Sequence, residues 1–359
     1  MSDIRFLPED WQRIEQTYQQ WWDHELDRPL VYFTSVYDPP GAPKVPGHSG
    51  FLSNYGLDAP VDLILDNYQR LQSGRHFPAD SFPFWFVNFG AGLLAEPLGA
   101  RLRSTAETVW FEPPAGADLG TLEISFNDSS PWWAKMLELT EAAAERFGET
   151  VQIGHTDIGG NLDILASLVG SEPLMMELVD RPSLVEDACR RITECWIEAF
   201  DAVDRIIAPH CHGRVAWAPT WAKGTTYMLQ SDASYMISPE MFDRFVMPDL
   251  EACCEHIEYP FYHLDGVGQI AHLDSMFTIE NLRGIQWIPG DGQPQAEDWP
   301  DLLQRILDAG RLVQVFTDAR GAFKICRELG GRGIQMMLRD SLTPREAGEV
   351  MAEVRRLCG

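Results

Sequence analysis

The stretch Phe261-Tyr262-His263-Leu264-Asp265-Gly266-Val267-Gly268 decides how the rest of the chain is interpreted. Strand-like residues at 259–262 lead directly into a His-x-Asp pair and then into glycine. Side chains at positions i and i+2 of a strand project from the same face, so His263 and Asp265 are predicted to point together into the space at the strand end. The sequence therefore predicts a pair of titratable groups aimed at one spot.

Apolar runs alternate with helical patterns from residue 151 to the end of the chain. The longest helical pattern follows Arg181-Pro182 and places apolar residues every three or four positions from Val185 to Ile206. Alternation of this kind implies parallel strands with crossover helices. No G-x-G-x-x-G turn opens a helix, which weakens the alternative of an open dinucleotide-binding sheet. The runs interpreted as strands are 151–154, 214–217 or 227–230 or both, 259–262, 284–288, 312–316 and 333–338.

We therefore predict an α/β protein with one structural domain, a (β/α)8 TIM barrel, whose strand ends would converge on one face. Residues 126–359 would form the main part of the barrel, and residues 1–125 an N-terminal elaboration that includes the first barrel elements. The aromatic stretch 82–92 predicts a strand that runs into a pocket-lining loop, with Asn88 facing a ligand. Other elements expected in the elaboration are a helix over 8–26, a strand over 30–33 followed by a break at 38–41, a helix over 62–71, and strands over 108–111 and 122–126 that pair as a hairpin.

Composition narrows the classes of partner. The 359-residue chain carries a formal charge of −26, from 54 acidic and 28 basic residues. Binding to phosphates requires clustered Lys and Arg, so nucleic acid and anionic membrane surfaces are disfavoured. Seven cysteines form no C-x-x-C pair, a pattern that favours the reducing cytoplasm over a disulfide framework. The N-terminus has no signal-peptide pattern, and no apolar run approaches the roughly 18 residues of a membrane span.

Polar residues follow several of the predicted strands. His155 and Asp157 follow the first, Asp232 follows 227–230, and His263 and Asp265 end the strand quoted above. Two His-x-Asp pairs on one rim predict a site for a divalent metal, with Zn²⁺ as the first choice and Mn²⁺ or Fe²⁺ behind it. The alternative is that each Asp only orients its His and that the His is structural.

These residues receive different roles. Asp157, Asp232 and Asp265 cannot all stay ionised close together without a cation, so one of them is a candidate proton carrier. The candidate metal ligands are His263 and Asp265. The candidate catalytic residues are His263, Asp232 and Asp157. The candidate substrate-binding residues are Trp287, Tyr262, Asn88, Asn161 and His155.

Other motifs carry less weight. The tripeptide His210-Cys211-His212 looks like a metal motif, but it has no second cluster at ligand spacing, and adjacent residues seldom reach the same ion. The chain has no G-x-S-x-G elbow, no P-loop, no H-E-x-x-H and no EF-hand loop. Serine hydrolases, P-loop enzymes and zincins are therefore disfavoured.

The segment from Ser231 to Pro248, with its Ser238-Pro239-x-x-Phe242 core, resembles uroporphyrinogen decarboxylases and the related methylcobamide:coenzyme M methyltransferases. Gly170-x-Glu172-x-Leu174 followed by Asp180-x-Pro182 is similar to a second stretch of that family. The resemblance covers residues 130 to 358 approximately, and it implies a TIM barrel. The strand that ends at Gly266 falls where the methyltransferases carry a His-x-Cys zinc motif.

The chain departs from both branches of that family. The first hundred residues contain no arginine-rich segment of the kind that holds a porphyrinogen in the decarboxylases. Asp265 stands where the methyltransferases have Cys, and the last strand offers Met336 and Met337 but no Cys. Such a site is harder than a thiolate site and suits an oxygen-liganded metal or acid/base chemistry. The corrinoid-binding signature D-x-H-x-x-G is also missing, so a corrinoid would be supplied by a partner protein.

The prediction is a methyltransferase of the uroporphyrinogen decarboxylase-like superfamily that moves a methyl group between a separate corrinoid protein and a small acceptor or donor. Two other functions stay open. One is a metal-dependent lyase, hydrolase or decarboxylase acting on a small polar molecule with the same residues. The other is a ligand-binding barrel without catalysis.

Overall fold

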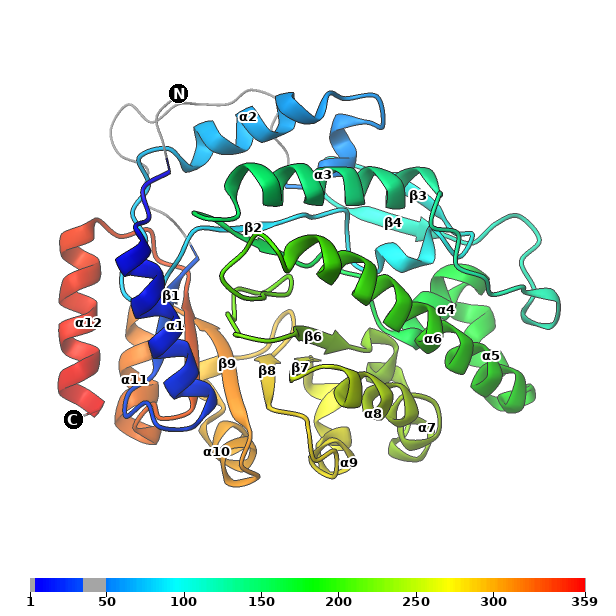
Figure 1. Ribbon diagram of the computed structural model, residues 1–359. Coiled ribbons are helices and arrows are strands. Elements are labelled where there is room, and N and C mark those ends of the chain that lie inside the picture. Colours follow the sequence, from blue (N-terminus) through cyan, green and yellow to red (C-terminus); the bar gives the residue numbers. More distant parts are fainter. Residues whose placement is uncertain (1–3, 35–49, 359) are drawn as a thin grey trace.

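The computed structural model of the chain describes residues 4–34 and 50–358 (Figure 1). The expected break at 38–41 and the first three residues of the chain lie outside these ranges. The strands are β1 (Leu30–Phe33), β2 (Phe84–Phe86), β3 (Arg101–Ser104), β4 (Val109–Glu112), β5 (Gln152–Gly154), β6 (Thr226–Gln230), β7 (Tyr259–Asp265), β8 (Gly284–Ile288), β9 (Leu312–Thr317) and β10 (Ile334–Leu338). The helices are α1 (Pro8–Trp22), α2 (Val61–Gln72), α3 (Pro131–Phe147), α4 (Asn161–Val169), α5 (Ser171–Asp180), α6 (Pro182–Ile207), α7 (Pro239–Phe245), α8 (Met247–His256), α9 (Leu273–Phe277), α10 (Pro300–Asp308), α11 (Ala319–Leu329) and α12 (Pro344–Cys358).

Six parallel strands form the central sheet, in the order β1-β10-β9-β8-β7-β6. Two further pairs are separate from it: β2 with β5, which is parallel, and β3 with β4, which is antiparallel. The expected parallel α/β arrangement is therefore present. The expected hairpin is corrected, because the partner of β4 is β3 and not the segment 122–126. Residues 214–217 form no strand, since only Arg214 makes an isolated bridge, to Ala222.

Within residues 4–34 and 50–358 the central sheet is not closed, so the structure confirms a parallel α/β fold but not the predicted (β/α)8 barrel. Its hydrogen-bonded ladder stops at β1 on one side and at β6 on the other. Isolated hydrogen bonds link the segments that flank this pair to both ends of the central sheet: Asp80 N–H, before β2, donates to the Val31 carbonyl of β1 over 3.1 Å, and Ile158 N–H, after β5, donates to the Tyr227 hydroxyl of β6 over 2.8 Å. The β2-β5 pair therefore lies between the two ends of the central sheet.

Helices lie around the outside of the strands (Figure 1). The longest, α6, begins with Pro182 at its first turn and buries the predicted apolar stripe, including Val185, Ile192 and Val203. Helix α1 covers the N-terminal side of the sheet, where the Trp22 ring lies 5.0 Å from the ring of Tyr259 at the start of β7. The C-terminal strand ends are left for a functional site, as in other parallel α/β enzymes.

A row of polar side chains crosses the interior of the central sheet. Gln230, His263, Gln286, Gln314 and Gln335 occupy matching positions on β6, β7, β8, β9 and β10. Because paired residues of neighbouring strands project from the same face, these five side chains lie next to one another. The four glutamines are buried. We call Gln286, Gln314 and Gln335 the glutamine row.

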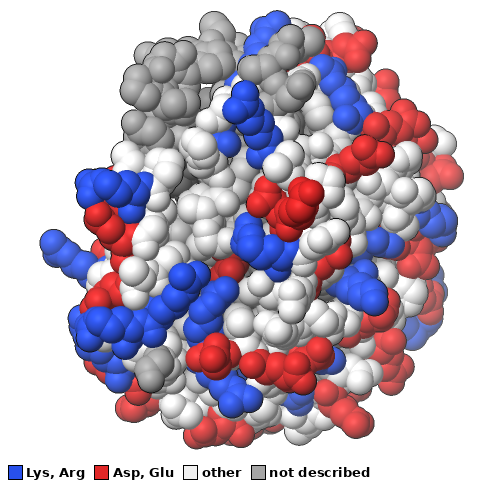
Figure 2. Space-filling view, turned by 60° about the vertical axis from the view of Figure 1, so that its left-hand side comes forward, with Lys and Arg blue, Asp and Glu red and all other residues white. Residues whose placement is uncertain are grey.

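Charged side chains of both signs lie on the molecular surface. On the face seen in Figure 2, basic and acidic side chains are interspersed. Ion pairs within helix α12, such as Arg356 with Glu353 at 2.6 Å, contribute to this pattern. None of the helices in the described part of the chain combines the length and apolarity needed to cross a bilayer.

Candidate functional site

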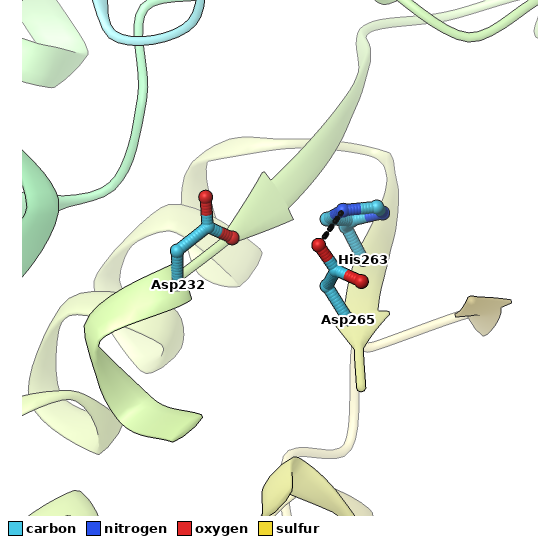
Figure 3. A group of neighbouring side chains, drawn as sticks. All are labelled: Asp232, His263 and Asp265. Atoms are coloured by element: carbon cyan, nitrogen blue, oxygen red, sulfur yellow. Dashed lines mark ion pairs between the residues drawn. The ribbon is translucent and has the colours of Figure 1, made fainter. Parts of the chain in front are cut away.

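The structure brings Asp232, His263 and Asp265 together at the C-terminal ends of β6 and β7 (Figure 3). Asp232 opens the 3-10 turn Asp232–Met236 directly after β6, and the other two end β7. One ligand atom from each residue lies within 4.8 Å of the others. Within residues 4–34 and 50–358, no other set of three His, Cys, Asp or Glu side chains meets this criterion. The expected pairing of His263 with Asp265 is confirmed, with 3.7 Å between Nε2 and Oδ2.

A cavity of about 330 Å³ opens beside this cluster. Asp291 and Tyr235 contribute to its wall, and among the described residues neither Lys nor Arg does. Gly266 has a φ of +86°, and a Cβ atom there would lie 2.8 Å from the Tyr235 ring, so glycine is required at this point of the wall. The described residues that line it are Asp232, Tyr235, Asp265, Gly266, Val267, Pro289, Gly290, Asp291 and Gln293.

His263 is half-buried and is held from two sides. Its Nδ1 contacts Gln286 Oε1, and its ring lies edge-on to Trp217 at 5.1 Å. Burial by itself would lower the pKa of His263, but Asp265, the Gln286 carbonyl and Asp232 outweigh it and raise this pKa. The imidazole is thus a base at the edge of an acidic cavity.

Asp157, a predicted catalytic residue, is buried behind the cluster. It accepts hydrogen bonds from Gly159 N–H at 2.9 Å and from Gly92 N–H and Gln230 Nε2 at 3.4 Å each. Burial raises the pKa of Asp157 to about 6, against the opposing effect of the backbone hydrogen bonds. A carboxyl group with this pKa exchanges protons close to neutral pH.

Asp163 belongs to the site but was not among the predicted residues. Its carboxylate accepts the backbone N–H groups of Asp232 and Ala233, each at 2.8 Å, and so fixes the turn that carries Asp232. Burial and the charge of Asp232 raise the pKa of Asp163. The pKa of Asp232 is also raised, first by desolvation. Asp163 lies in the first turn of α4, where an acidic residue is common for helix stability, so its sequence position gave no functional signal.

Tyr262 and Trp287 do not reach the cavity. Each is adjacent in its strand to an inward-facing residue, His263 or Gln286, and therefore points to the opposite face. Both are fully buried there. The Tyr262 hydroxyl donates to Gln269 Oε1 at 3.1 Å, and the Trp287 ring packs against Trp299 at 5.3 Å. Neither side chain lines the cavity beside the cluster, and both pack in the core.

His155 also has a structural environment. Its ring stacks on Phe200 at 4.9 Å, and its Nδ1 lies 2.9 Å from its neighbour's carbonyl, that of Thr156. Burial lowers the pKa of His155. It belongs neither to the cluster nor to the cavity wall, so of the two His-x-Asp motifs only the second contributes its histidine, His263, to the cluster.

The two predicted asparagines lie elsewhere. Asn88 shapes its own loop, since its Oδ1 accepts Gly90 N–H at 3.0 Å. Asn161 is buried at the start of α4 and faces a separate cavity of about 520 Å³ between helices, next to Asp249. Neither residue lines the cavity beside His263.

No model of a known protein family matches the sequence, and no curated protein sequence matches it either. The fold does have a solved counterpart. A methyltransferase from Methanosarcina mazei superposes with a TM-score of 0.60 over 96% of this chain and 98% of the other chain, with 16% sequence identity. The chain shares the fold of that methyltransferase. At this identity the likeness concerns the arrangement of the backbone, and the chemistry has to be argued from the site.

Proposed function

We propose that the chain is a metal-dependent methyltransferase of the uroporphyrinogen decarboxylase-like superfamily, which moves a methyl group between a separate corrinoid protein and a small acceptor or donor. The observation that carries the proposal is the cluster of Asp232, His263 and Asp265 beside an open cavity at the strand ends. The whole-chain likeness to a methyltransferase fold supports it.

The donor atoms of the cluster fit a divalent cation. One imidazole nitrogen and two carboxylates make a harder ligand set than thiolates, which suits Zn²⁺, Mn²⁺ or Fe²⁺. His263 and Asp265 would provide ligands from one strand end, and Asp232 from the next. When bound, such a cation acts as a Lewis acid and lowers the pKa of a thiol or water beside it. Without a cation, Asp232 and Asp265 repel each other across the cavity mouth.

The surrounding residues would handle the acceptor and its proton. Asp157 has a pKa of about 6, so it can accept a proton that a thiol or alcohol releases near neutral pH. Tyr235 and Gln293 on the cavity wall would contact the acceptor. A cavity of about 330 Å³ admits a small acceptor but is smaller than a corrin ring, which supports a corrinoid presented by a partner protein at the cavity mouth.

We further propose that the eight parallel strands β1, β2 and β5–β10 form a (β/α)8 barrel in which the strand ladder is interrupted at two places, between β1 and β2 and between β5 and β6. Support comes from the segments that flank the β2-β5 pair: the residues before β2 are hydrogen-bonded to β1, and the residues after β5 are hydrogen-bonded to β6. A cytoplasmic location is proposed as well, because all seven cysteines are free.

A metal-dependent lyase, decarboxylase or hydrolase is the second candidate. The observation that favours it is the pair of carboxyl groups near the cluster, Asp157 and Asp163, whose pKa values are both raised. Two proton-exchanging acids next to a metal site suffice for such reactions without a corrinoid.

Metal content and methyl transfer test the proposal. We expect the purified protein to bind about one divalent ion per chain by titration and elemental analysis, and His263→Ala to weaken this binding at least about 10-fold by loss of a ligand. Asp291→Asn is the matched control, because Asp291 lines the same cavity outside the cluster. Transfer from free methylcobalamin to a panel of small thiols should require the ion. Absence of stoichiometric metal would refute the metal site, and metal binding without methyl transfer to any acceptor would favour the lyase or hydrolase.

A further inference from the structure

The glutamine row forms one continuous hydrogen-bonded chain that ends at His263. Gln286 Nε2 donates to Gln314 Oε1, and Gln314 Nε2 donates to Gln335 Oε1 at 2.8 Å. Gln286 Oε1 in turn contacts His263 Nδ1. All three glutamines have no exposed surface, so water does not compete for these bonds. The chain spans four neighbouring strands, from β10 to β7.

The direction of this chain is fixed at its far end by a backbone carbonyl. Gln335 Nε2 lies 3.0 Å from the carbonyl oxygen of Pro219, in the loop between α6 and β6. A carbonyl can only accept, so Gln335 must turn its amide nitrogen to Pro219 and its oxygen to Gln314. Gln314 must then offer its nitrogen to Gln335 and its oxygen to Gln286.

The same reasoning carries through to the histidine. Gln286 uses its nitrogen toward Gln314, which leaves its oxygen toward His263. An amide oxygen is only an acceptor, so His263 must donate from Nδ1. Thr220 reinforces the arrangement, because its hydroxyl accepts from Gln314 Nε2 and donates to Gln335 Oε1 at 2.7 Å. If one glutamine exchanged the positions of its amide oxygen and nitrogen, N–H groups would face N–H groups at several buried contacts.

We propose that the glutamine row is a positioning device that fixes the tautomer of His263, with the proton on Nδ1 and the lone pair of Nε2 directed at the Asp232–Asp265 cavity. The 3.7 Å between Nε2 and Asp265 Oδ2 is longer than a hydrogen bond, so Nε2 has no need of a proton. Use of the lone pair to bind a cation rests on the proposed function, whereas the tautomer itself does not. The outer partner of a metal-binding histidine commonly plays this part.

Nitrogen NMR of the metal-free protein tests the tautomer directly. In protein labelled with ¹⁵N-histidine, treated with chelator and kept at a pH where the ring is neutral, the His263 signals are assigned by their loss in His263→Ala. We expect a protonated Nδ1 and an unprotonated Nε2. A protonated Nε2 in the unsubstituted protein would overturn the proposal, whether or not any variant folds. The readout needs no metal, so failure of the proposed metal site leaves it unaffected.

Substitutions within the row test the relay. Gln286→Met removes the acceptor of the His263 Nδ1 proton, and Gln335→Met removes the glutamine that is bonded to the Pro219 carbonyl. Both variants should shift His263 toward the Nε2-protonated form. Both should also weaken Zn²⁺ binding about 10- to 100-fold. Gln152→Met is the matched control, since Gln152 is equally buried but bonds only to the backbone carbonyls of Ile153 and Gly213. An unchanged tautomer in a folded Gln335→Met variant would refute the far anchor, and a shift in Gln152→Met would make the effect unspecific.

Discussion

At the scale of single residues, the burial of the Asp157 carboxyl makes stability depend on pH. Folding raises the pKa of Asp157 from 3.8 to about 6, so the folded state holds more protons than the unfolded state between these values. Stability therefore falls as the pH rises through this window, and the cost is complete above about pH 6. A shift of this size corresponds to about 3 kcal/mol of unfolding free energy.

We expect Asp157→Asn to remove this cost. At about pH 4 the variant and the unsubstituted protein should differ little in this respect, because Asp157 is largely protonated there. At about pH 7.5 the unfolding free energy of the variant should be higher by up to about 3 kcal/mol. Urea unfolding of metal-free samples at the two pH values measures the gain. Asp128→Asn, at an exposed position, controls for the loss of one negative charge. Equal pH dependence of Asp157→Asn and the unsubstituted protein would show that this carboxyl does not titrate in that window.

The sequence predicted some residues of the site and misplaced others for one physical reason. Alternation along a strand placed His263 and Asp265 together correctly. The same rule assigns Tyr262 and Trp287 to the opposite face. They were predicted to bind substrate because aromatic rings often line pockets, and the alternation was not applied to them. Asp163 could not be found, because its role depends on backbone N–H groups nearly seventy residues later in the chain.

At the scale of elements, the junction between β6 and the start of α4 has no room for a side chain at Gly160. A Cβ atom there would lie 2.0 Å from the Gln230 carbonyl oxygen. Gly160→Ala must therefore displace the helix start that carries Asn161 and Asp163. We expect a loss of about 1–3 kcal/mol of unfolding free energy, as for other overpacked sites, measured by chemical unfolding.

Gly348→Ala provides the contrast. Gly348 lies inside α12, and apart from its chain neighbours and the backbone of its own helix, no atom of the described residues lies within 4 Å of the added Cβ position. Alanine should stabilise this helix by about 0.5–1 kcal/mol, because glycine has the larger loss of backbone entropy. If Gly160→Ala proved as harmless as Gly348→Ala, the close approach of α4 to β6 would be refuted.

Individual helices were easier to predict than strand partners. The apolar stripe of α6 is a local signal, and the helix lies where the stripe places it, at Pro182–Ile207. The segment 122–126 alternates Leu122, Ile124 and Phe126, and these side chains do pack on the core. Within the described part of the chain no other backbone pairs with the segment, so the alternation reflects a partly buried face and not a strand. Strand pairing depends on distant residues that a local pattern does not contain.

At the scale of the whole molecule, side chains join the sheet to the β2-β5 pair where the ladder stops. Asp80 Oδ2 accepts Val31 N–H and Ser81 Oγ accepts Phe33 N–H, each at 2.9 Å. These oxygens replace the carbonyls of a missing neighbouring strand along β1. The sequence predicted parallel strands but not this seam, the contact between β1 and residues Asp80 and Ser81. Single side chains form the contact, and no local sequence pattern indicates it.

Asp80 is the residue on which this seam depends. Only 2% of its side chain is exposed, and it forms a two-pronged ion pair with Arg28 at 2.7 and 2.9 Å. Asp80→Ala would leave the Arg28 guanidinium and the Val31 N–H without their acceptor in a buried place, which should cost about 3–5 kcal/mol. Urea unfolding measures this loss. Asp66→Ala breaks a partly exposed pair with Arg146 and should cost less than about 1 kcal/mol. If Asp80→Ala and Asp66→Ala caused equally small losses, the Asp80 carboxylate would not be what joins β1 to the segment before β2. Backbone hydrogen bonds would then be sufficient for this contact.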